Sequence, residues 1–494
     1  MNFSKKAILI ILTASLVRVF LSAILDLGND EVYYLLYGRY PAWNYFDHTA
    51  LIGWVLNIVT FDFHFQHSFF YRLPSVFGAA ICTWIAYKTG TYLKNERTGL
   101  WAAIVYNLSF YFSIIAGVFL IPDSIQLPFT AVAVYSALQI IGRNGMIARN
   151  RHFLIFGVMA GFSMLAKIHG LFLWVGFGGY ILMFERQLLK NKMLWISLLI
   201  SLVFIVPFAV WNFQNEFMSF RFHGERVLPG NGFKVEGLFR ELAGEFAYQN
   251  PFIWIIILLS VIQLQKRLSF SNEIKLLLWL SFPILFTVWT ISLFRDTLPH
   301  WTGPGYYPLI FVCALWLEEK ERFQKMRLPR LAFSLLIVFV TAGLVLINLY
   351  PGTFGKQNQA ELGRGDFTLD MYGWSTEGPV IAGYLKRKEL SRYRIASPQW
   401  FPAAHIDEYI ARAAGTSVYG LGPLFDIHQY HWINDKRGEP KLKDTLLYIE
   451  VSNLPRRPEQ VTGSRFSSFQ LDTVFTQNRN GRPARNFFIY RLIP

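Results

Sequence analysis

The stretch MNFSKKAILIILTASLVRVFLSAIL (residues 1–25) opens with a basic flank and continues as an apolar run of spanning length. It contains no convincing small-residue cleavage site, so we expect a retained first span rather than a removed signal peptide. Further apolar segments lie at 70–93, 98–118, 124–142, 153–168, 171–184, 194–212, 252–265, 275–294, 304–317 and 331–349. We therefore predict a polytopic, all-α membrane domain with about eleven spans.

The composition of the 494-residue chain agrees with this prediction. Charged residues make up 16% and hydrophobic residues 53%, whereas soluble domains carry about a quarter charged residues. The net charge of +15 is not gathered on one patch, so we do not expect nucleic-acid binding. The two cysteines, Cys82 and Cys313, fall inside apolar segments, which favours small buried side chains over a disulfide or a metal site.

The basic residues predict the orientation of the chain. They recur between alternate apolar segments, in clusters at 5–6, 88–97, 143–151, 186–192, 266–267 and 320–330. Cytoplasmic loops carry such an excess of lysine and arginine. We therefore expect a cytoplasmic N-terminus, with the C-terminus outside after about eleven spans.

The character of the chain changes after Tyr350-Pro351-Gly352. Residues 351–494 are polar, rich in Gly, Pro and Arg, and contain no run of spanning length. Segments 445–451 and 487–490 look like strands. We predict a membrane domain over 1–350 and a small extracytoplasmic α/β domain over 351–494.

The first predicted outer loop, DLGNDEVYYLLYGRYPAWNYFDHTALIGW (26–54), is the most informative part of the sequence. Asp30 and Glu31 stand at the start of a predicted short helix, whose tyrosine stripe is typical of a helix in the membrane interface. Asp47 and His48 precede the next apolar segment. A solvated loop with an ordinary helix cap is the alternative, but three carboxylates and a histidine beside the bilayer favour a functional site.

Three residues outside this loop are further candidates. Asp123 opens a predicted span, where it caps the helix, contributes to a site, or does both. Lys167 lies near the outer end of another apolar segment, where an ionisable group either has a function or extends to the interface. Arg72 heads a span and either binds phosphate or anchors the helix end.

Several common catalytic motifs are absent from the sequence. There is no GxxxxGK[ST] phosphate loop, no GxGxxG after a strand and no HExxH pair. A cytoplasmic nucleotide-driven mechanism therefore has no support, and a substrate activated by a lipid phosphate agrees better with the location of the candidate residues.

Five blocks of sequence together resemble a known family. They are DEVYYLLYG (30–38) with YFDHTALIGW (45–54), RLPSVFGA (72–79), LIPDSIQLPF (120–129), VWNFQNEFMSFRFHGER (210–226) and LPHWTGPGYYPL (298–309). The chain resembles the bacterial protein-mannosyltransferase-like glycosyltransferases of the C-type superfamily, which include aminoarabinose–lipid A transferases and rhizobial lipopolysaccharide transferases. The likeness extends over about residues 1–320 and implies the C-type membrane fold; the segment after 350 has no counterpart in it.

The resemblance also implies roles for the candidate residues. Asp30 is implied as the catalytic base, with Glu31 beside it and Asp123 as the second acidic position. Asp47 and His48 correspond to an acidic–basic pair near the donor phosphate, although relatives carry a lysine in place of His48. Lys167 and His300, with Arg72, complete the expected donor-phosphate site.

The implied reaction moves a sugar from a polyprenyl-phosphate donor to an acceptor hydroxyl, with inversion at the anomeric carbon. The acceptor is a lipid, a glycan or a protein, and the expected location is a bacterial inner membrane, among membrane lipids. No cofactor is certain; a divalent cation is one possible source of positive charge, and metal ligands are unknown. The alternatives are a flippase or transporter of lipid-linked sugars and an envelope-assembly scaffold, but charges concentrated on outer loops favour the transferase.

Overall fold

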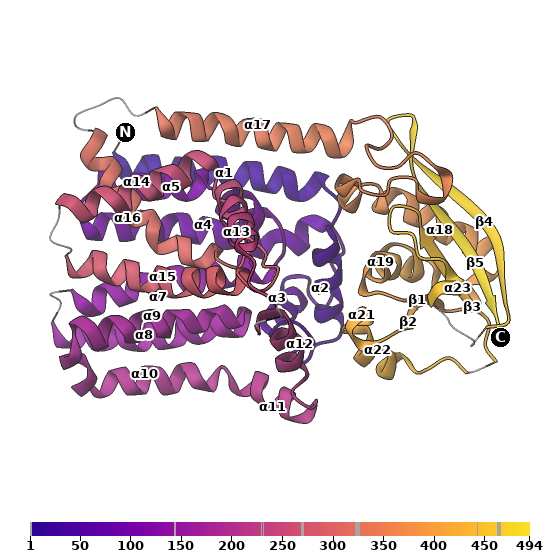
Figure 1. Cartoon of the computed structure of the whole chain (residues 1–494), viewed down its shortest axis with the longest axis horizontal. Helices are drawn as coiled ribbons and strands as arrows, with labels where there is room; N and C mark the ends of the chain where they lie inside the picture. The colour runs from indigo at the N-terminus through magenta and orange to yellow at the C-terminus, as the bar shows by residue number, and fades with distance from the viewer. Residues whose placement is uncertain are drawn as a thin grey trace. The chain divides into compact units, whose positions relative to one another are not determined.

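The computed structural model describes residues 2–142, 145–228, 230, 232–267, 271–321, 327–441, 443–461 and 466–494, so Arg143, Arg322 and Lys325 of the basic clusters lie outside it. The chain forms two compact units. The first comprises Met1–Ala23 and Pro41–Val338, and the second comprises Ile24–Tyr40 and Phe339–Pro494 (Figure 1). The second unit thus includes a piece of the first predicted outer loop.

The first unit is a bundle of apolar helices, and every predicted apolar segment falls on a helix or a bent helix pair. The helices are α1 (Phe3–Ile24), α3 (Leu51–Val59), α4 (Ser68–Leu93), α5 (Glu96–Leu108), η1 (Tyr111–Ile115), α6 (Ala116–Val118), α7 (Pro122–Ile141), α8 (Met146–Ala166), α9 (Leu171–Phe184), α10 (Lys192–Val203), α11 (Val206–Gln214), α12 (Met218–Val227), α13 (Val235–Tyr248), α14 (Pro251–Arg267), α15 (Asn272–Ser292), α16 (Gly303–Glu321) and α17 (Leu328–Asn348), whose first half belongs here.

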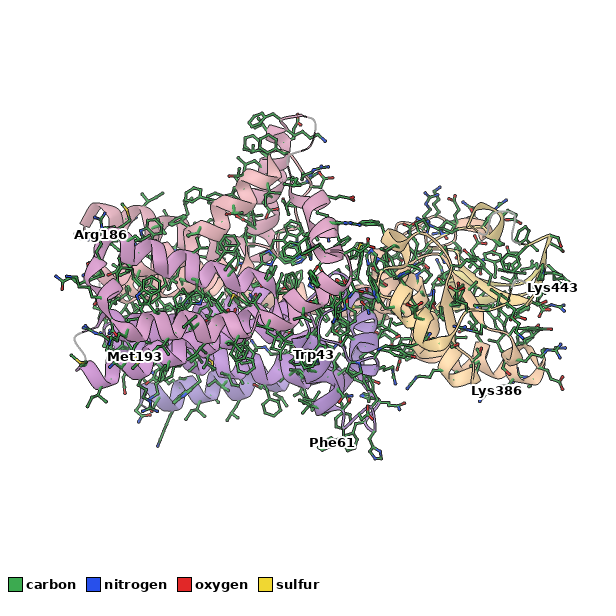
Figure 2. All side chains as sticks on the ribbon, turned by 90° about the horizontal axis from the view of Figure 1, so that it is seen from below. Trp43, Phe61, Arg186, Met193, Lys386 and Lys443 are labelled. Atoms are coloured by element: carbon green, nitrogen blue, oxygen red, sulfur yellow. The ribbon has the colours of Figure 1, made fainter. Side chains whose placement is uncertain are left out.

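Among the described residues, five helices are long and apolar enough to cross a bilayer, or eight if each bent pair counts as one span. A multi-pass membrane protein is therefore confirmed, while about eleven crossings stay a prediction. Figure 2 shows Arg186 and Met193 at one end of the bundle and Trp43 and Phe61 toward the other. The basic loop at 186–192, predicted to be cytoplasmic, and the aromatic loop after α1 thus lie at opposite ends of the helices.

Small residues allow the helices to approach closely, as is usual in membrane bundles. A Cβ atom at Gly157 of α8 would lie 2.5 Å from the Ser197 carbonyl oxygen of α10. A Cβ at Gly176 of α9 would lie 2.3 Å from the Trp279 carbonyl oxygen of α15. Both cysteines are buried in the core of this unit and unpaired, as predicted.

A break in one helix pair has a specific support. The α5 helix and the π-helical turn η1 with α6 are bent by 77°. Arg18, buried in α1, donates from Nε to the Ser113 carbonyl (3.0 Å) and from Nη2 to Asn107 Oδ1 (2.8 Å). These bonds satisfy polar groups that the break would otherwise leave unpaired in an apolar surrounding, and they hold Tyr111 at the start of η1.

The second unit contains a five-stranded mixed sheet in the order β2-β1-β3-β5-β4. Strands β1 (Ile395–Ser397), β2 (Val418–Gly420) and β3 (Leu446–Val451) are parallel, and β4 (Ser468–Arg479) and β5 (Arg482–Ile493) form an antiparallel hairpin. Its turn is Asn480-Gly481, with φ of 46° and 78°, the left-handed pair that a tight hairpin prefers. Both predicted strand segments are therefore confirmed as parts of β3 and β5.

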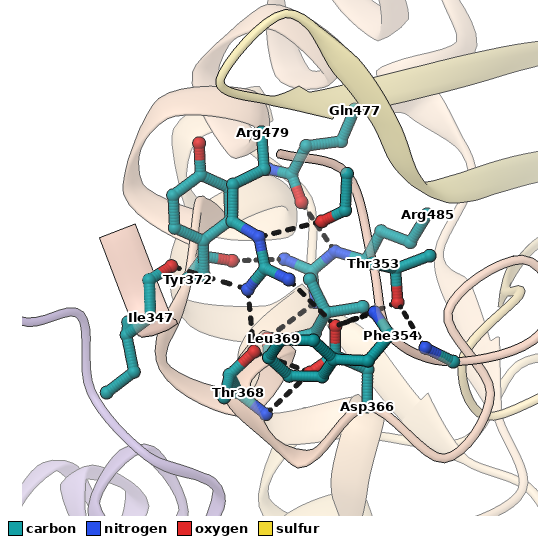
Figure 3. Close-up of polar contacts among 12 residues, drawn as sticks. Ile347, Thr353, Phe354, Asp366, Thr368, Leu369, Tyr372, Gln477, Arg479 and Arg485 are labelled. Atoms are coloured by element: carbon teal, nitrogen blue, oxygen red, sulfur yellow. Dashed lines mark hydrogen bonds and ion pairs between the residues drawn. The ribbon is translucent and has the colours of Figure 1, made fainter. Parts of the chain in front are cut away.

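Helices of the second unit include α2 (Asn29–Arg39), α18 (Trp374–Arg387), α19 (Trp400–His405), the π-helical turn η7 (Ile406–Ala411), α20 (Arg412–Ala414) and α22 (Tyr430–Arg437). Buried arginines tie the loop after α17 to the hairpin (Figure 3). Arg479 pairs with Asp366 at 2.8 Å and donates to the Gly352 carbonyl at 2.8 Å. Arg485 donates to Gln477 Oε1 at 2.6 Å and to the Tyr372 carbonyl at 2.7 Å.

Candidate active site

The first-loop segment that carries Asp47 and His48 is a tight turn. The Tyr45 amide donates to the His48 carbonyl at 3.0 Å, closing the turn around Asp47. Asn44 is fully buried and donates to the Tyr45 carbonyl (2.8 Å) and to Ser219 Oγ of α12 (3.1 Å). The buried Asn44 side chain therefore holds the turn against α12.

Asp123 and Lys167 form an almost fully buried ion pair. Lys167 Nζ lies 2.9 and 2.8 Å from the two carboxylate oxygens of Asp123, and the side chains are 4% and 3% exposed. Tyr111 donates to Asp123 Oδ1 at 2.7 Å. Asp123 lies in the first turn of α7, where an acid is favoured, and Lys167 follows the last residue of α8. Gln126 holds this end of α8 through the Lys167 carbonyl, at 3.2 Å.

Besides the neighbouring His169, three histidines from other segments lie within electrostatic range of Lys167: His48, His223 of α12, and His300 of the loop before α16. His223 Nε2 donates to the Asp47 carbonyl at 3.1 Å, which joins α12 to the turn. Burial lowers the pKa of His48 and that of His300 to about 4, and it also lowers the pKa of His223. All three rings are therefore neutral near pH 7.

The His300 loop is itself anchored. Thr297 donates to Glu241 Oε2 of α13 at 2.6 Å, and Glu241 is 1% exposed. Trp301 follows His300, and its ring lies 6.4 Å from that of His169. The guanidinium of Arg226 lies 5.5 Å from the Trp301 ring centroid, so an exposed cation of α12 borders the same loop.

We name Asp47, His48, Asp123, Lys167, His223 and His300 the Asp123 cluster. Five segments of the first unit contribute to it, and four of its members were predicted as donor-site residues and one as catalytic. The cluster offers one buried ammonium and the neutral imidazoles of His48 and His300, each of which has one N–H to donate, whereas His223 already donates its N–H to the Asp47 carbonyl. This combination can recognise an anionic group such as a phosphate, provided that protons are taken up as it binds.

Arg72 has a different setting. Its guanidinium is fully buried, donates to the Ser22 carbonyl of α1 at 3.2 Å, and lies 5.4 Å from the Phe119 ring centroid. These contacts favour the helix-anchoring alternative that the sequence left open. A direct contact with a donor phosphate stays a prediction.

Asp30 and Glu31 lie in the second unit, on α2. Glu31 is 3% exposed, and its Oε2 accepts from the Gly28 amide at 3.0 Å, which caps the helix. Asp30 is exposed. Of the predicted catalytic pair, Asp30 is thus the exposed member, while Glu31 caps the helix.

Among the described residues, no group of three or more His, Cys, Asp or Glu side chains is arranged to hold a metal ion. Lys167 is the buried cationic side chain of the Asp123 cluster.

Sequence reasoning did not single out Tyr111, His223 or Glu241. His223 lies inside the quoted block 210–226, three residues before Arg226. Its place in that block is the one sequence signal that could have identified it. Tyr111 and Glu241 carry no such signal, because an aromatic in a span and an acid on an amphipathic helix are common.

Comparisons with known proteins agree with the predicted resemblance. The model of the family described as dolichyl-phosphate-mannose-protein mannosyltransferase matches residues 47–211. The structure of ArnT from Cupriavidus metallidurans in the apo state is similar at 13% identity with a TM-score of 0.69, covering 99% of this chain and 98% of that one. The same protein bound to undecaprenyl phosphate is similar at 14% identity and a TM-score of 0.66, covering 98% and 97%. No curated protein matches the chain in sequence.

The structural likeness shows a shared fold over nearly the whole length of both chains, including the segment after residue 350. The matched family segment contains Asp47, His48, Asp123 and Lys167. The predicted resemblance to the protein-mannosyltransferase-like glycosyltransferases is thus confirmed.

Proposed function

We propose that this membrane glycosyltransferase of the protein-mannosyltransferase-like class moves a sugar from a polyprenyl-phosphate donor to an acceptor hydroxyl. The observation that supports this proposal is the Asp123 cluster, in which a buried lysine and three neutral histidines converge from separate segments. Such a cluster is suited to a phosphate whose charge grows during the reaction.

The proposed reaction is a single in-line displacement. The acceptor oxygen forms a bond to the anomeric carbon, and the bond from that carbon to the phosphate oxygen breaks, which inverts the centre. The carboxylate of Asp30 takes the proton of the acceptor hydroxyl. The electron pair leaves with the polyprenyl phosphate, where Lys167 and the imidazoles of His48 and His300 stabilise the charge.

The balance of charge in the cluster has a consequence for donor binding. The ammonium of Lys167 is already paired with the Asp123 carboxylate, and the three histidine rings are neutral. An arriving phosphate favours the charged form of a nearby imidazole and raises its pKa. We therefore expect His48 or His300 to take up a proton as the donor binds.

The proposed setting follows the predicted topology. Transfer takes place on the extracytoplasmic face of a bacterial inner membrane, with the N-terminus in the cytoplasm and residues 351–494 outside. The acceptor is a hydroxyl of a lipid, a glycan or a protein. Sugar-donor specificity is open to measurement with a panel of donors.

The test uses the full chain purified in detergent with radiolabelled polyprenyl-phosphate sugars. Release of polyprenyl phosphate is compared for wild type and Asp30→Asn, with thermal unfolding of both as the control for folding. Release by wild type that a folded Asp30→Asn loses supports the transferase and identifies the donor. Donor binding by wild type without turnover of any sugar in the panel contradicts the transferase and favours the flippase or transporter.

A further inference from the structure

The helix that carries Asp30 is packed as an element of the C-terminal domain. Residues Ile24–Tyr40 group with Phe339–Pro494, not with the apolar bundle that precedes and follows them in sequence. Helix α2 has only 11 residues, and an isolated helix of that length is marginal in water. Its position must therefore come from its partners, which lie at both of its ends and along its middle.

The C-terminal end of α2 is held by an ion pair. Arg39 Nη2 lies 2.8 and 3.1 Å from the two oxygens of Glu408, whose side chain is 10% exposed. Arg412 approaches the same carboxylate at 3.2 Å. A pair this well shielded from water is screened less than a surface salt bridge.

The residue after α2 is held by a second charged group. Arg437 of α22 donates from Nε to the Tyr40 hydroxyl at 2.9 Å, and its guanidinium lies 5.2 Å from the Tyr40 ring centroid. Its Nη2 pairs with Asp407 at 2.7 Å. Asp407 and Glu408 both belong to the π-helical turn η7. Such turns are rare and are frequent at functional sites.

The N-terminal end of α2 is tied to a buried stack. His405 is fully buried, and its Nε2 lies 2.9 Å from Asn29 Oδ1, next to Asp30. Burial keeps the pKa of His405 well below its usual value, so the neutral ring uses one N–H to donate to Asn29. The ring stacks on Trp374 at 4.3 Å, and Arg485 lies 4.2 Å from the centroid of that indole.

The middle of α2 packs against α19. The rings of Tyr33 and Trp400 lie 4.8 Å apart, and the Gln429 amide donates to the Tyr33 hydroxyl at 3.1 Å. Residues between 400 and 437 thus supply aromatic packing at the centre of α2 and hydrogen bonds or ion pairs at both of its ends.

We propose that the C-terminal domain is a positioning clamp that sets the orientation of α2 and therefore of Asp30. Arg39, Glu408, His405 and Arg437 are positioning residues that act through the helix, not on the substrate. The inference rests on the proposed role of Asp30 as the base. A base must lie within hydrogen-bond reach of the acceptor hydroxyl, and a misplacement of about 1 Å costs on the order of a hundredfold in rate.

The test compares Arg39→Glu with the double variant Arg39→Glu/Glu408→Arg, and His405→Ala with His405→Gln, in the full-length chain. The Gln amide can still donate to Asn29. Lys386→Glu, at an exposed position of α18, is the matched control. Amide hydrogen exchange of peptides within 29–40 is measured beside kcat and the KM for the donor, and Tm reports folding.

We expect faster exchange in 29–40 and a loss of about tenfold or more in kcat for Arg39→Glu and His405→Ala. The donor KM should stay within about twofold of wild type, since the Asp123 cluster is untouched. The charge swap and His405→Gln should recover part of both losses, and Lys386→Glu should change neither. Unchanged exchange in the single variants overturns the clamp. Faster exchange with unchanged kcat shows that α2 is clamped but contradicts Asp30 as the base.

Discussion

Lys167 Nζ contacts both carboxylate oxygens of Asp123, at 2.9 and 2.8 Å, while each side chain is at most 4% exposed. The two residues are 44 positions apart and join the start of α7 to the end of α8. Taking two charges out of water costs free energy that their attraction must offset. This pair therefore matters to both the stability of the bundle and the charge offered to a donor.

Removing one charge of the Asp123–Lys167 ion pair should destabilise the protein strongly. We expect Lys167→Met to lower the free energy of unfolding by about 3–5 kcal/mol, because Asp123 is left as a buried unpaired charge. Asp123→Asn/Lys167→Met should regain most of this stability, since no charge remains. Thermal unfolding in detergent measures both. Recovery of donor release by the double variant would contradict the proposed role of the pair in the reaction.

Removing the hydroxyl of Tyr111 should weaken the same site. The Tyr111→Phe variant loses a hydrogen bond of 2.7 Å to the Asp123 carboxylate, and bonds to charged groups contribute about 1.5–3 kcal/mol. Tyr307→Phe is the matched control, because the buried Tyr307 hydroxyl has no hydrogen-bond partner among the described residues. We expect a lower Tm for Tyr111→Phe and little change for Tyr307→Phe. Equal shifts would mean that the bond contributes nothing measurable.

The buried histidines should make stability fall in acid. The pKa of His48 and of His300 drops from 6.5 to about 4 on folding. Between these values the unfolded chain binds more protons, so the stability present above pH 6.5 is lost as the pH falls toward 4. The loss is at most about 3 kcal/mol for each ring. Tm measured from pH 7.5 to 4.5 should show this decline.

Two additions make the pH experiment specific. His48→Gln/His300→Gln should flatten the decline, whereas His64→Gln, at an exposed position, should not. Added polyprenyl phosphate should also flatten it in wild type, because an anion favours the protonated rings. A decline that neither the double variant nor the phosphate changes would place the responsible groups elsewhere.

We expect Asp30 to contribute to catalysis and Glu31 to contribute to folding stability. We expect Asp30→Asn to reduce kcat by about 10²–10⁴-fold, the usual contribution of a general base, with a smaller effect on folding than on catalysis because the residue is exposed. Glu31→Ala removes the bond to the Gly28 amide and should cost about 1 kcal/mol of stability. Kinetics and thermal unfolding of both variants test this. A fully active Asp30→Asn enzyme would remove the proposed base.

A truncation at residue 350 should not be used to assign the acceptor site. Deletion of 351–494 takes away the partners of α2, among them Glu408 and His405. Loss of transfer in such a variant would reflect the position of Asp30 as much as any contact with an acceptor. Point variants of the clamp avoid this ambiguity.

Much of the fold was predictable because it depends on local patterns. Spanning helices follow from apolar length, and the predicted segments coincide with helices throughout the described bundle. Strands at 446–451 and within 482–493 follow from runs of β-branched and aromatic residues. The bends were not predictable; at the 77° break before Tyr111, the Ser113 carbonyl accepts a bond from Arg18 of a helix distant in sequence.

The candidate site was predictable only in part. Asp123 and Lys167 were each selected from an isolated charge beside an apolar segment, but their pairing is a property of the packed helices. The neutrality of His48 likewise depends on burial by distant segments. Tyr111 could not be selected from sequence, since its hydroxyl acquires a role only where it meets Asp123.

The sequence by itself determined that the chain enters a membrane, which segments form its apolar helices, and which family it resembles, because hydropathy and short motifs are read from neighbouring residues. Only the tertiary structure decided that Glu31 caps a helix, that Arg72 bonds to a carbonyl of α1, and that α2 groups with the residues after 339. Charges and hydrogen bonds at a site depend on burial and on partners far apart in the chain, and these are settled by packing alone.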